Sequence, residues 1–305
     1  MDNLTHSLIG AALGQAGFKR KTGLAMPALI IGANVPDIDA VTVVYGIESL
    51  AMRRGITHGP VAMVVLPVLL ALGLRWFDTW QARRGTRPEA RAPVHFGWLL
   101  ALSFLACLTY PLFDWFNNYG VRLLEPFSSR WFYGDTLFII DPWIIAMLGI
   151  GIWYSLRRER NGHAGWRLPA GMAICGTVAF VLLNIAISWL SVSNARSVLA
   201  ELNVPQPDVV VANGIPLEFW RRERLIRIGS LYANYDDFGE GARPTNMSDP
   251  RIAEWAKHDP AAQAFLFWSR MPVAELHHDR IILHDQRFMD PRVADRFSVT
   301  LRPPK

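Results

Sequence analysis

Residues 96–113 read FGWLLALSFLACLTYPLF, an eighteen-residue stretch without a charged side chain, and Asp114 follows it directly. A helix of this length spans about 27 Å, close to the roughly 30 Å of hydrocarbon in a bilayer. Three further segments are similarly apolar and nearly as long or longer, namely Pro60–Phe77, Leu137–Leu156 and Leu168–Val192. The sequence therefore predicts a polytopic α-helical membrane domain.

The N-terminal region is apolar in a different way. Leu4–Phe18 and Gly23–Tyr45 are rich in Gly and Ala, and Asn34-Val-Pro-Asp-Ile-Asp39 interrupts the second stretch. Two short spans and a re-entrant pair are both compatible with this pattern. Only 19% of the 305 residues are charged, compared with about 25% in a typical soluble domain. This shortage of charge excludes a disordered or collagenous chain and favours a membrane part joined to a soluble part.

The soluble part begins after the last long apolar segment. Short β-type runs bounded by Gly, Pro and Asp occur at 208–211, 224–235, 280–284 and 296–301. Residues 249–271 have helical spacing, which Pro260 must interrupt. We therefore expect a transmembrane helical domain over residues 1–193, followed by a small, mostly β (α+β) soluble domain over residues 194–305.

Two arginine clusters predict the orientation in the membrane. By the positive-inside rule, both connections should be cytoplasmic, which places the C-terminal domain in the periplasm. Membrane anchoring also explains the net charge of +5 without a nucleic-acid partner, so that membrane lipid is the expected partner and protein partners stay undefined. The clusters are Arg83, Arg84, Arg87 and Arg91, and Arg157, Arg158, Arg160 and Arg167.

Seven ionisable side chains share one predicted depth, at the outer ends of the apolar segments. Such groups are costly beside hydrocarbon unless they are paired or ligated, so each is a candidate for function. Imidazole and carboxylate ligands suit zinc, manganese or iron, and clustered metals suit phosphoester chemistry. The seven are His6, Asp37, Asp39, His58, Asp114, Asp135 and Asp141.

Structural explanations compete for several of these residues. Asp37 or Asp39 could cap the next helix, and the two carboxylates reach one region only if Pro36 breaks the helix. Asp141 before Pro142 is better explained as an N-cap with proline at N1 than as a ligand. His58 alone is typical of a polar helix interface. In the tail, His277, His278 and His284 give only a weak indication of metal binding.

Several motifs together resemble a known family over roughly residues 1–156. They are Met1-Asp-Asn-Leu-Thr-His6, Asn34-Val-Pro-Asp-Ile-Asp39, Arg54-Gly-Ile-Thr-His58, and the block that runs from Pro111-Leu-Phe-Asp114 through Trp131-Phe-Tyr-Gly-Asp135 to Asp141-Pro-Trp143. This set resembles the bacterial inner-membrane family of membrane-bound metal-dependent hydrolases. The order of its histidines and aspartates is also similar, more distantly, to zinc-dependent phospholipase C.

The resemblance implies metal ligation by His6, Asp37, Asp39, His58 and Asp114. It also marks two departures, because the family commonly has histidine where this chain has Tyr110 and Arg53. Tyr110 lies four residues before Asp114, so both side chains should share one helix face. We expect the phenol to donate a hydrogen bond to a metal-bound oxygen or to Asp114; the alternative is an aromatic anchor that faces lipid.

The expected function is metal-dependent hydrolysis of an ester or phosphoester, in a lipid or lipid-linked substrate that approaches from the outer leaflet. The cofactor would be a divalent metal, zinc first, with manganese or iron possible. Asp114 and either Asp37 or Asp39 would be catalytic, one of the latter pair as general base. Substrate contacts are expected from Tyr110, Arg122, Arg130 and Asp135, although both arginines could instead pair with Glu125 or Asp135. The alternative is a non-enzymatic envelope protein with a structural metal or polar network and a partner-binding tail.

Overall fold

The computed structural model describes residues 1–304, which form two compact units. The first unit comprises Met1–Ile38 and Arg54–Asn184, and the second comprises Asp39–Arg53 and the chain from Ile185 onward. Helices dominate the first unit, whereas the second contains two small antiparallel sheets. The predicted fold class, an α-helical membrane domain followed by a small β-rich domain, is confirmed.

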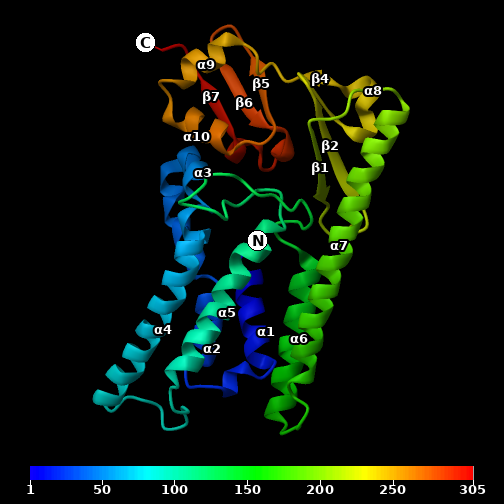
Figure 1. The fold of residues 1–305 in the computed structure, drawn as a ribbon. Coiled ribbons are helices and arrows are strands. Elements are labelled where there is room, and N and C mark those ends of the chain that lie inside the picture. Colours follow the sequence, from blue (N-terminus) through cyan, green and yellow to red (C-terminus); the bar gives the residue numbers. More distant parts are fainter. Residues whose placement is uncertain (305) are drawn as a thin grey trace. The chain divides into compact units, whose positions relative to one another are not determined.

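The first unit is a bundle in which α5 is central (Figure 1). α5 packs against α2 and α4, while α1 packs against α2 and α6. Small residues allow the close approach, because a Cβ on Gly10 would lie 2.4 Å from the Leu29 carbonyl oxygen. The helices are α1 (Asn3–Gln15), α2 (Ala25–Gly32), α4 (Pro60–Arg83), α5 (Phe96–Trp115), α6 (Pro142–Arg160) and α7 (Leu168–Glu201), with short 3-10 turns η1 (Phe18–Arg20) and η3 (Ile56–His58).

Four helical segments among the described residues are long and apolar enough to cross a membrane: Ala25–Met52, Pro60–Arg83, Phe96–Trp115 and Leu168–Glu201. The first is not one regular helix, because η2 (Val35–Glu48) follows α2, is kinked at Gly46, and leads into α3 (Ser49–Met52). The predicted span Leu137–Leu156 corresponds to α6, which is outside this group of four. Pro142 starts α6 five residues late and arginines fill its last turn, so its apolar part is shorter than the hydrocarbon thickness.

Aspartates cap the N-terminal ends of two helices of the first unit, α1 and α6. Asp141 accepts hydrogen bonds from the Trp143 and Ile144 amides at 3.0 and 3.2 Å, which confirms the predicted N-cap with Pro142 at N1. Asp2 caps α1, accepting from the Thr5 amide at 3.0 Å and from the Thr5 hydroxyl at 2.6 Å. This second cap fixes the start of α1 one turn before His6.

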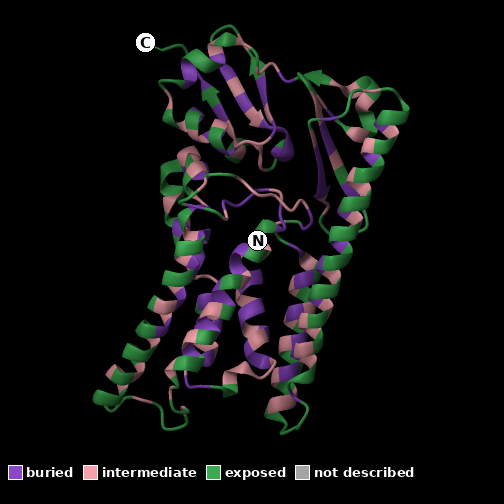
Figure 2. Cartoon of the chain, in the orientation of Figure 1, coloured by how far each residue is buried: buried purple, intermediate pink, exposed green. Residues whose placement is uncertain are grey.

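The second unit contains a four-stranded sheet in the order β1-β2-β3-β4 and a three-stranded sheet in the order β5-β6-β7, both antiparallel. Buried and half-buried residues alternate along β6 (Figure 2). The strands are β1 (Val209–Gly214), β2 (Arg222–Ile228), β3 (Leu231–Asn234), β4 (Arg243–Pro244), β5 (Pro272–Leu276), β6 (Ile281–Asp285) and β7 (Ser298–Leu301), with helices α8 (Phe238–Gly241), α9 (Pro250–Ala256) and α10 (Pro260–Trp268) and the 3-10 turns η4 (Tyr235–Asp237), η5 (Gln286–Phe288) and η6 (Ala294–Phe297).

Two tail predictions need correction. The run 224–235 is a hairpin and not one strand, because Gly229 adopts a positive φ of 56° and turns the chain between β2 and β3. The strand β5 was not predicted; it starts at Pro272, directly after the expected helix 249–271. That helix does break at Pro260, which is the first residue of α10 and follows the N-cap Asp259.

Candidate functional site

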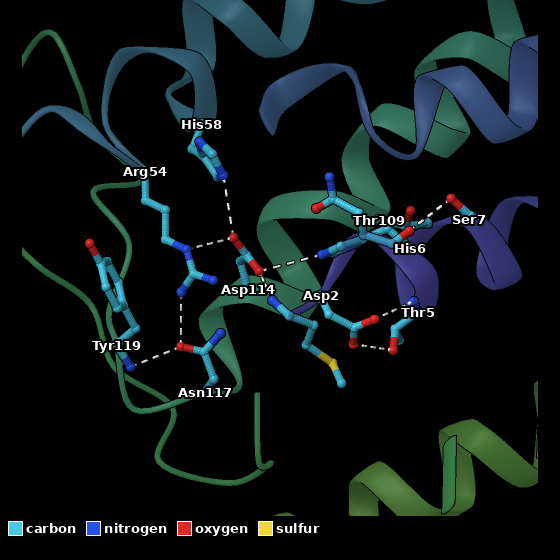
Figure 3. A network of polar contacts seen from close by, with 12 residues as sticks. Asp2, Thr5, His6, Ser7, Arg54, His58, Thr109, Asp114, Asn117 and Tyr119 are labelled. Carbon is cyan, nitrogen blue, oxygen red and sulfur yellow. Dashed lines mark hydrogen bonds and ion pairs between the residues drawn. The ribbon is translucent and has the colours of Figure 1, made fainter. Parts of the chain in front are cut away.

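The candidate site of the first unit is centred on Asp114, in the last turn of α5. Its side chain is fully buried, and so are those of His6 on α1 and His58 at the end of η3. The Nε2 atom of His6 lies 3.4 Å from Asp114 Oδ1, and the Nε2 atom of His58 lies 3.4 Å from Asp114 Oδ2 (Figure 3). Three segments far apart in sequence thus bring two imidazoles to one carboxylate.

Two cationic groups also contact this carboxylate. Arg54 Nε lies 2.9 Å from Asp114 Oδ2, and the Met1 amine contacts Oδ1. Arg54 Nη1 donates at 2.9 Å to Asn117 Oδ1, which also accepts from the Tyr119 amide at 2.8 Å, and the guanidinium lies 4.6 Å from the centre of the Tyr119 ring. The resulting network is shown in Figure 3. It extends from the end of α5 into the loop that follows.

Arg54 adopts a left-handed backbone conformation with φ of 54°. For a residue with a Cβ this costs on the order of 1–3 kcal/mol, and such strain is concentrated at functional sites. The Arg54 carbonyl accepts a hydrogen bond from the Arg122 amide at 2.8 Å, which helps to hold the segment in place. The strained backbone aims the guanidinium at Asp114.

Tyr110 lies between the two histidines, one helical turn before Asp114. Its ring stacks on His6 with centroids 3.8 Å apart, and meets His58 edge-on at 5.2 Å. Only 1% of the residue is exposed. The expectation that Tyr110 and Asp114 share one face is confirmed, and the lipid-facing alternative is excluded by this burial.

The position of His58 is fixed by its neighbours. Thr57 Oγ1 lies 2.9 Å from His58 Nδ1, so that the other ring nitrogen, Nε2, faces Asp114. A Cβ on Gly59 would lie 1.9 Å from the Glu125 carbonyl oxygen, and one on Gly55 would lie 2.4 Å from Arg122 Nη2. The loop after α5 therefore covers the His58 segment at a distance that only glycine permits.

The other predicted site residues lie in that loop or on η2. Arg122 pairs with Glu125 at 2.7 Å, which was the predicted alternative to a substrate contact. Its guanidinium lies 5.0 Å from the Trp131 ring centre. The Arg130 guanidinium lies 5.4 Å from the Phe132 ring centre. Asp135 has a positive φ of 48°.

Of the five ligands implied by the resemblance, the structure brings together His6, His58 and Asp114. Asp37 lies in the first turn of η2 and belongs to the first unit, whereas Asp39 belongs to the second. The helix does break before them, since α2 ends at Gly32. Participation of either carboxylate in the site stays a prediction.

Sequence reasoning missed the network that orients Asp114. Arg54, Asn117 and Tyr119 are all buried and in contact with one another. Arg54 stands in the same motif as His58, and Asn117 follows Asp114 by three residues. The available signal was that Arg54 lies on the expected outer side, four residues before His58 in the same motif.

The donor types of this cluster fit a divalent metal. Two ligand atoms bound tetrahedrally at about 2.0–2.1 Å lie roughly 3.4 Å apart, which is the separation of each imidazole nitrogen from its carboxylate oxygen. Each carboxylate oxygen has a second lone pair, so that Arg54 need not leave Oδ2. Within residues 1–304, however, no group of three or more His, Cys, Asp or Glu is placed so that it could hold a metal ion.

The tail histidines show a looser arrangement. His277 Nε2 lies 2.9 Å from Glu275 Oε1, and His284 Nε2 lies 3.9 Å from Glu275 Oε2, with the glutamate more than half exposed. Burial lowers the pKa of His284, and nearby Glu275 and Asp295 oppose that shift. An exposed carboxylate between two partly exposed histidines is a weaker candidate than the buried cluster.

Comparison with known proteins identifies the family. No curated protein and no solved structure matches the chain. A family described as YdjM inner membrane protein matches residues 1–194, a stretch that includes His6, His58 and Asp114 and most of the helical segments described above. Together with the four membrane-length helices, this match places the protein in the inner membrane. The chain belongs to the YdjM inner membrane protein family.

Proposed function

We propose that the first unit is a metal-dependent hydrolase that cleaves an ester or phosphoester bond in a lipid or lipid-linked substrate. The observation that carries the proposal is the pair of buried imidazoles, each with Nε2 at 3.4 Å from one oxygen of Asp114. This separation is long for an N–H···O hydrogen bond but suits two ligands of one metal. The buried position in a membrane domain favours a substrate that arrives from the bilayer.

In this proposal His6, His58 and Asp114 hold the metal, with zinc expected first and manganese or iron as alternatives. A bound metal would supply an activated water and polarise the scissile group. Thr57 fixes the ring of His58, as the hydrogen-bond partners of histidine ligands commonly do at metal sites. Arg54 holds Asp114 and adds positive charge that favours a phosphate.

The remaining roles follow the expectations from sequence. Asp37, which belongs to the first unit, would accept the proton of the attacking water, and Tyr110 would contact the substrate from its place against His6. Arg130 and Asp135 would lie at the approach to the site. Arg122 is already paired with Glu125, so its contribution to phosphate binding would require that pair to open.

Metal content is the first test. The full chain, purified in detergent, should carry a divalent metal when it is measured by plasma mass spectrometry. Asp114→Ala and His6→Ala should each lose most of it, and turnover of bis(p-nitrophenyl) phosphate and of phospholipid should fall by at least about a hundredfold. His163→Ala is the matched control, because His163 is exposed in the loop between α6 and α7.

Two results would overturn the proposal. One is a wild-type protein that binds no metal when zinc, manganese and iron are each supplied. The other is metal that stays bound at full stoichiometry in both ligand variants. Circular dichroism should show that the variants keep their helical content, which separates loss of ligand from loss of fold.

A second candidate function is supported by the satisfied part of the same cluster. Contacts of 2.8–2.9 Å join Arg54 to Asp114 and Asn117, and Asn117 to the Tyr119 amide, in one charged network. Such a network could fix the helices of a non-enzymatic envelope protein whose tail binds a partner. If this is correct, Arg54→Gln should lower the melting temperature strongly. Neither the wild type nor any variant should then turn over a phosphoester or a phospholipid above background.

The orientation of the chain is part of the proposal. The arginine clusters around 83–91 and 157–167 predict a periplasmic tail, which would put Asp114 near the outer face. Alkaline phosphatase fused after residue 305 should therefore be active in cells, and a cytoplasmic reporter at the same point should be silent. The reverse pattern would place the candidate site at the inner face.

A further inference from the structure

An apolar groove lies between α6 and α7, away from the Asp114 cluster. Its volume is 560 Å³, within the usual range for ligand sites. It flanks the closest approach of the two helices, where a Cβ on Gly151 would lie 2.4 Å from the Ala173 side chain. The lining includes Trp143, Ile150, Tyr154, Met172 and Gly176, and ends at Arg158.

Several side chains that line the groove are exposed at the surface of the helix pair. Ile150 and Met172 are 65% and 64% exposed, and in an inner-membrane protein such side chains contact lipid. From Trp143 to Arg158 the groove follows α6 for fifteen residues, or about 22 Å. That length exceeds half of the roughly 30 Å hydrocarbon thickness, so the groove can hold an acyl chain through the depth of one leaflet.

Positive charge is concentrated at the Arg158 end. The side chains of Lys19, Arg20 and Arg167 all lie over the buried Trp166 ring, at 4.6, 4.8 and 5.2 Å from its centre. The segments 19–21 and 157–167 together carry seven Lys and Arg and one acidic residue, Glu159, which pairs with Lys19. This end of the bundle therefore has a large excess of positive charge beside an apolar groove.

Arg158 is the basic residue that lines the groove itself. Its guanidinium lies 5.8 Å from the Tyr154 ring centre, and its Nε atom is buried without a hydrogen-bond partner among residues 1–304. A buried donor that lacks a partner is costly. A phosphate oxygen at the end of the groove would satisfy it and would match the surrounding charge.

We infer that this groove binds one anionic phospholipid of the bilayer, with an acyl chain between α6 and α7 and the phosphate at Arg158. The inference is independent of the proposed hydrolase, because none of these residues belongs to the Asp114 cluster. The bound lipid would be a resident of the groove and would add to the packing of α7 on α6 beside Gly151 and Ala173.

Native mass spectrometry of the full chain, released from micelles that contain phosphatidylglycerol and phosphatidylcholine, tests the inference. One phosphatidylglycerol should bind before any other lipid. Arg158→Gln should weaken that binding about fivefold, the contribution expected from one arginine at an anionic lipid. Gly176→Phe, which fills the groove, and Met172→Gln, which makes it polar, should both abolish the preference for the first lipid.

Matched controls separate a site from diffuse attraction. Arg160→Gln removes a neighbouring exposed charge, and Gly149→Phe adds the same ring to α6 at a glycine that faces open space outside the groove. Both should bind the first lipid as the wild type does. Equal loss in Arg160→Gln and Arg158→Gln, equal binding of phosphatidylcholine, or unchanged binding in both groove variants would overturn the inference.

Discussion

Asp114 and Asp285 are both buried carboxylates that contact an arginine, one in each unit, yet their surroundings differ. Arg287 grips Asp285 through Nε and Nη2, both at 2.8 Å, and the Ser269 hydroxyl and the Met271 amide donate to the same carboxylate at 2.5 and 3.3 Å. These partners are sixteen or fewer residues away. Asp285 is thus satisfied by its own hairpin and its immediate neighbours.

Asp114 is arranged differently. Its partners come from other segments of the first unit, and the two imidazoles face it at 3.4 Å instead of hydrogen-bonding to it. The Nδ1 atom of His6 has no hydrogen-bond partner within residues 1–304. Asp114 is also paired with Arg54 and the Met1 amine, so the two imidazoles are additional ligands beside it that a further group could use. This contrast favours Asp114 over Asp285 as the candidate for a functional role.

The largest effect should come from breaking the structural pair. Asp285→Ala leaves Arg287, which is 5% exposed, buried without its counter-ion. We expect a loss of about 3–5 kcal/mol of stability in the second unit, measured as lost hydrogen-exchange protection in β6, with metal content unchanged. Asp290→Ala is the control, because Asp290 pairs with Arg292 in the same i, i+2 arrangement on the surface. Equal effects in both variants would refute the assigned role of burial.

Loosening the candidate metal site should have a smaller effect, which falls on metal affinity and not on the fold. Thr57→Val keeps the volume of the side chain but removes the oxygen at 2.9 Å from His58 Nδ1. Metal affinity should fall by about 10–100-fold, as when a hydrogen-bond partner of a metal ligand is removed, while the melting temperature without metal stays the same. Thr79→Val on exposed α4 is the control. Unaltered affinity would mean that Thr57 does not orient the ring.

Tyr110 sharpens the comparison by adding or removing one group beside Asp114. Tyr110→His supplies an imidazole one turn from Asp114 and should raise metal affinity or stoichiometry. Tyr110→Phe preserves the stack on His6 and should retain metal while losing several-fold in turnover. The two variants are measured by metal titration and by phosphoesterase assay. Unchanged metal content and turnover in both would remove Tyr110 from the site.

The smallest expected effect is on the stability of the second unit at acidic pH. Burial alone would raise the pKa of Asp285, but Arg287 and the hydrogen bonds from Ser269 and from the Arg287 backbone outweigh it, so the pKa is lowered below its usual value. A lowered carboxyl pKa contributes stability above the unfolded-state pKa of about 3.9, and this is lost as pH falls through the folded value. The difference in the free energy of unfolding between wild type and Asp285→Asn should therefore decrease below about pH 4. Acid unfolding curves of the two proteins measure this difference. A constant difference would contradict this.

Sequence predicted the helices best where apolar length decides the structure. The start of α5 at Phe96 was predicted correctly, but α4 continues to Arg83, beyond the expected end at Phe77, because charged residues can extend a helix out of the bilayer. The turn at Gly229 depends on one positive φ, and the start of α6 depends on the cap at Asp141. A hydropathy profile of the sequence shows neither this turn nor this cap.

The candidate site could be predicted only in part. His6, His58 and Asp114 were marked by their cost in a membrane and by motif, and the structure brings them together. Arg54 could not be assigned, because its role depends on a strained backbone and on Asn117, sixty-three residues away. Asp39 carries the same motif signal as Asp37 but belongs to the other unit, a division that sequence spacing does not reveal.

Gly59 has a consequence for how this protein can evolve. Any side chain there would place a carbon 1.9 Å from the Glu125 carbonyl oxygen, so the loop backbone would have to retreat by about an ångström before the replacement could be accepted. That loop also carries Arg122, whose amide bonds to the Arg54 carbonyl. The effect of a substitution at position 59 therefore depends on the sequence of the loop. A lineage can replace this glycine only after residues 122–126 have been remodelled. That remodelling would also change the support of Arg54.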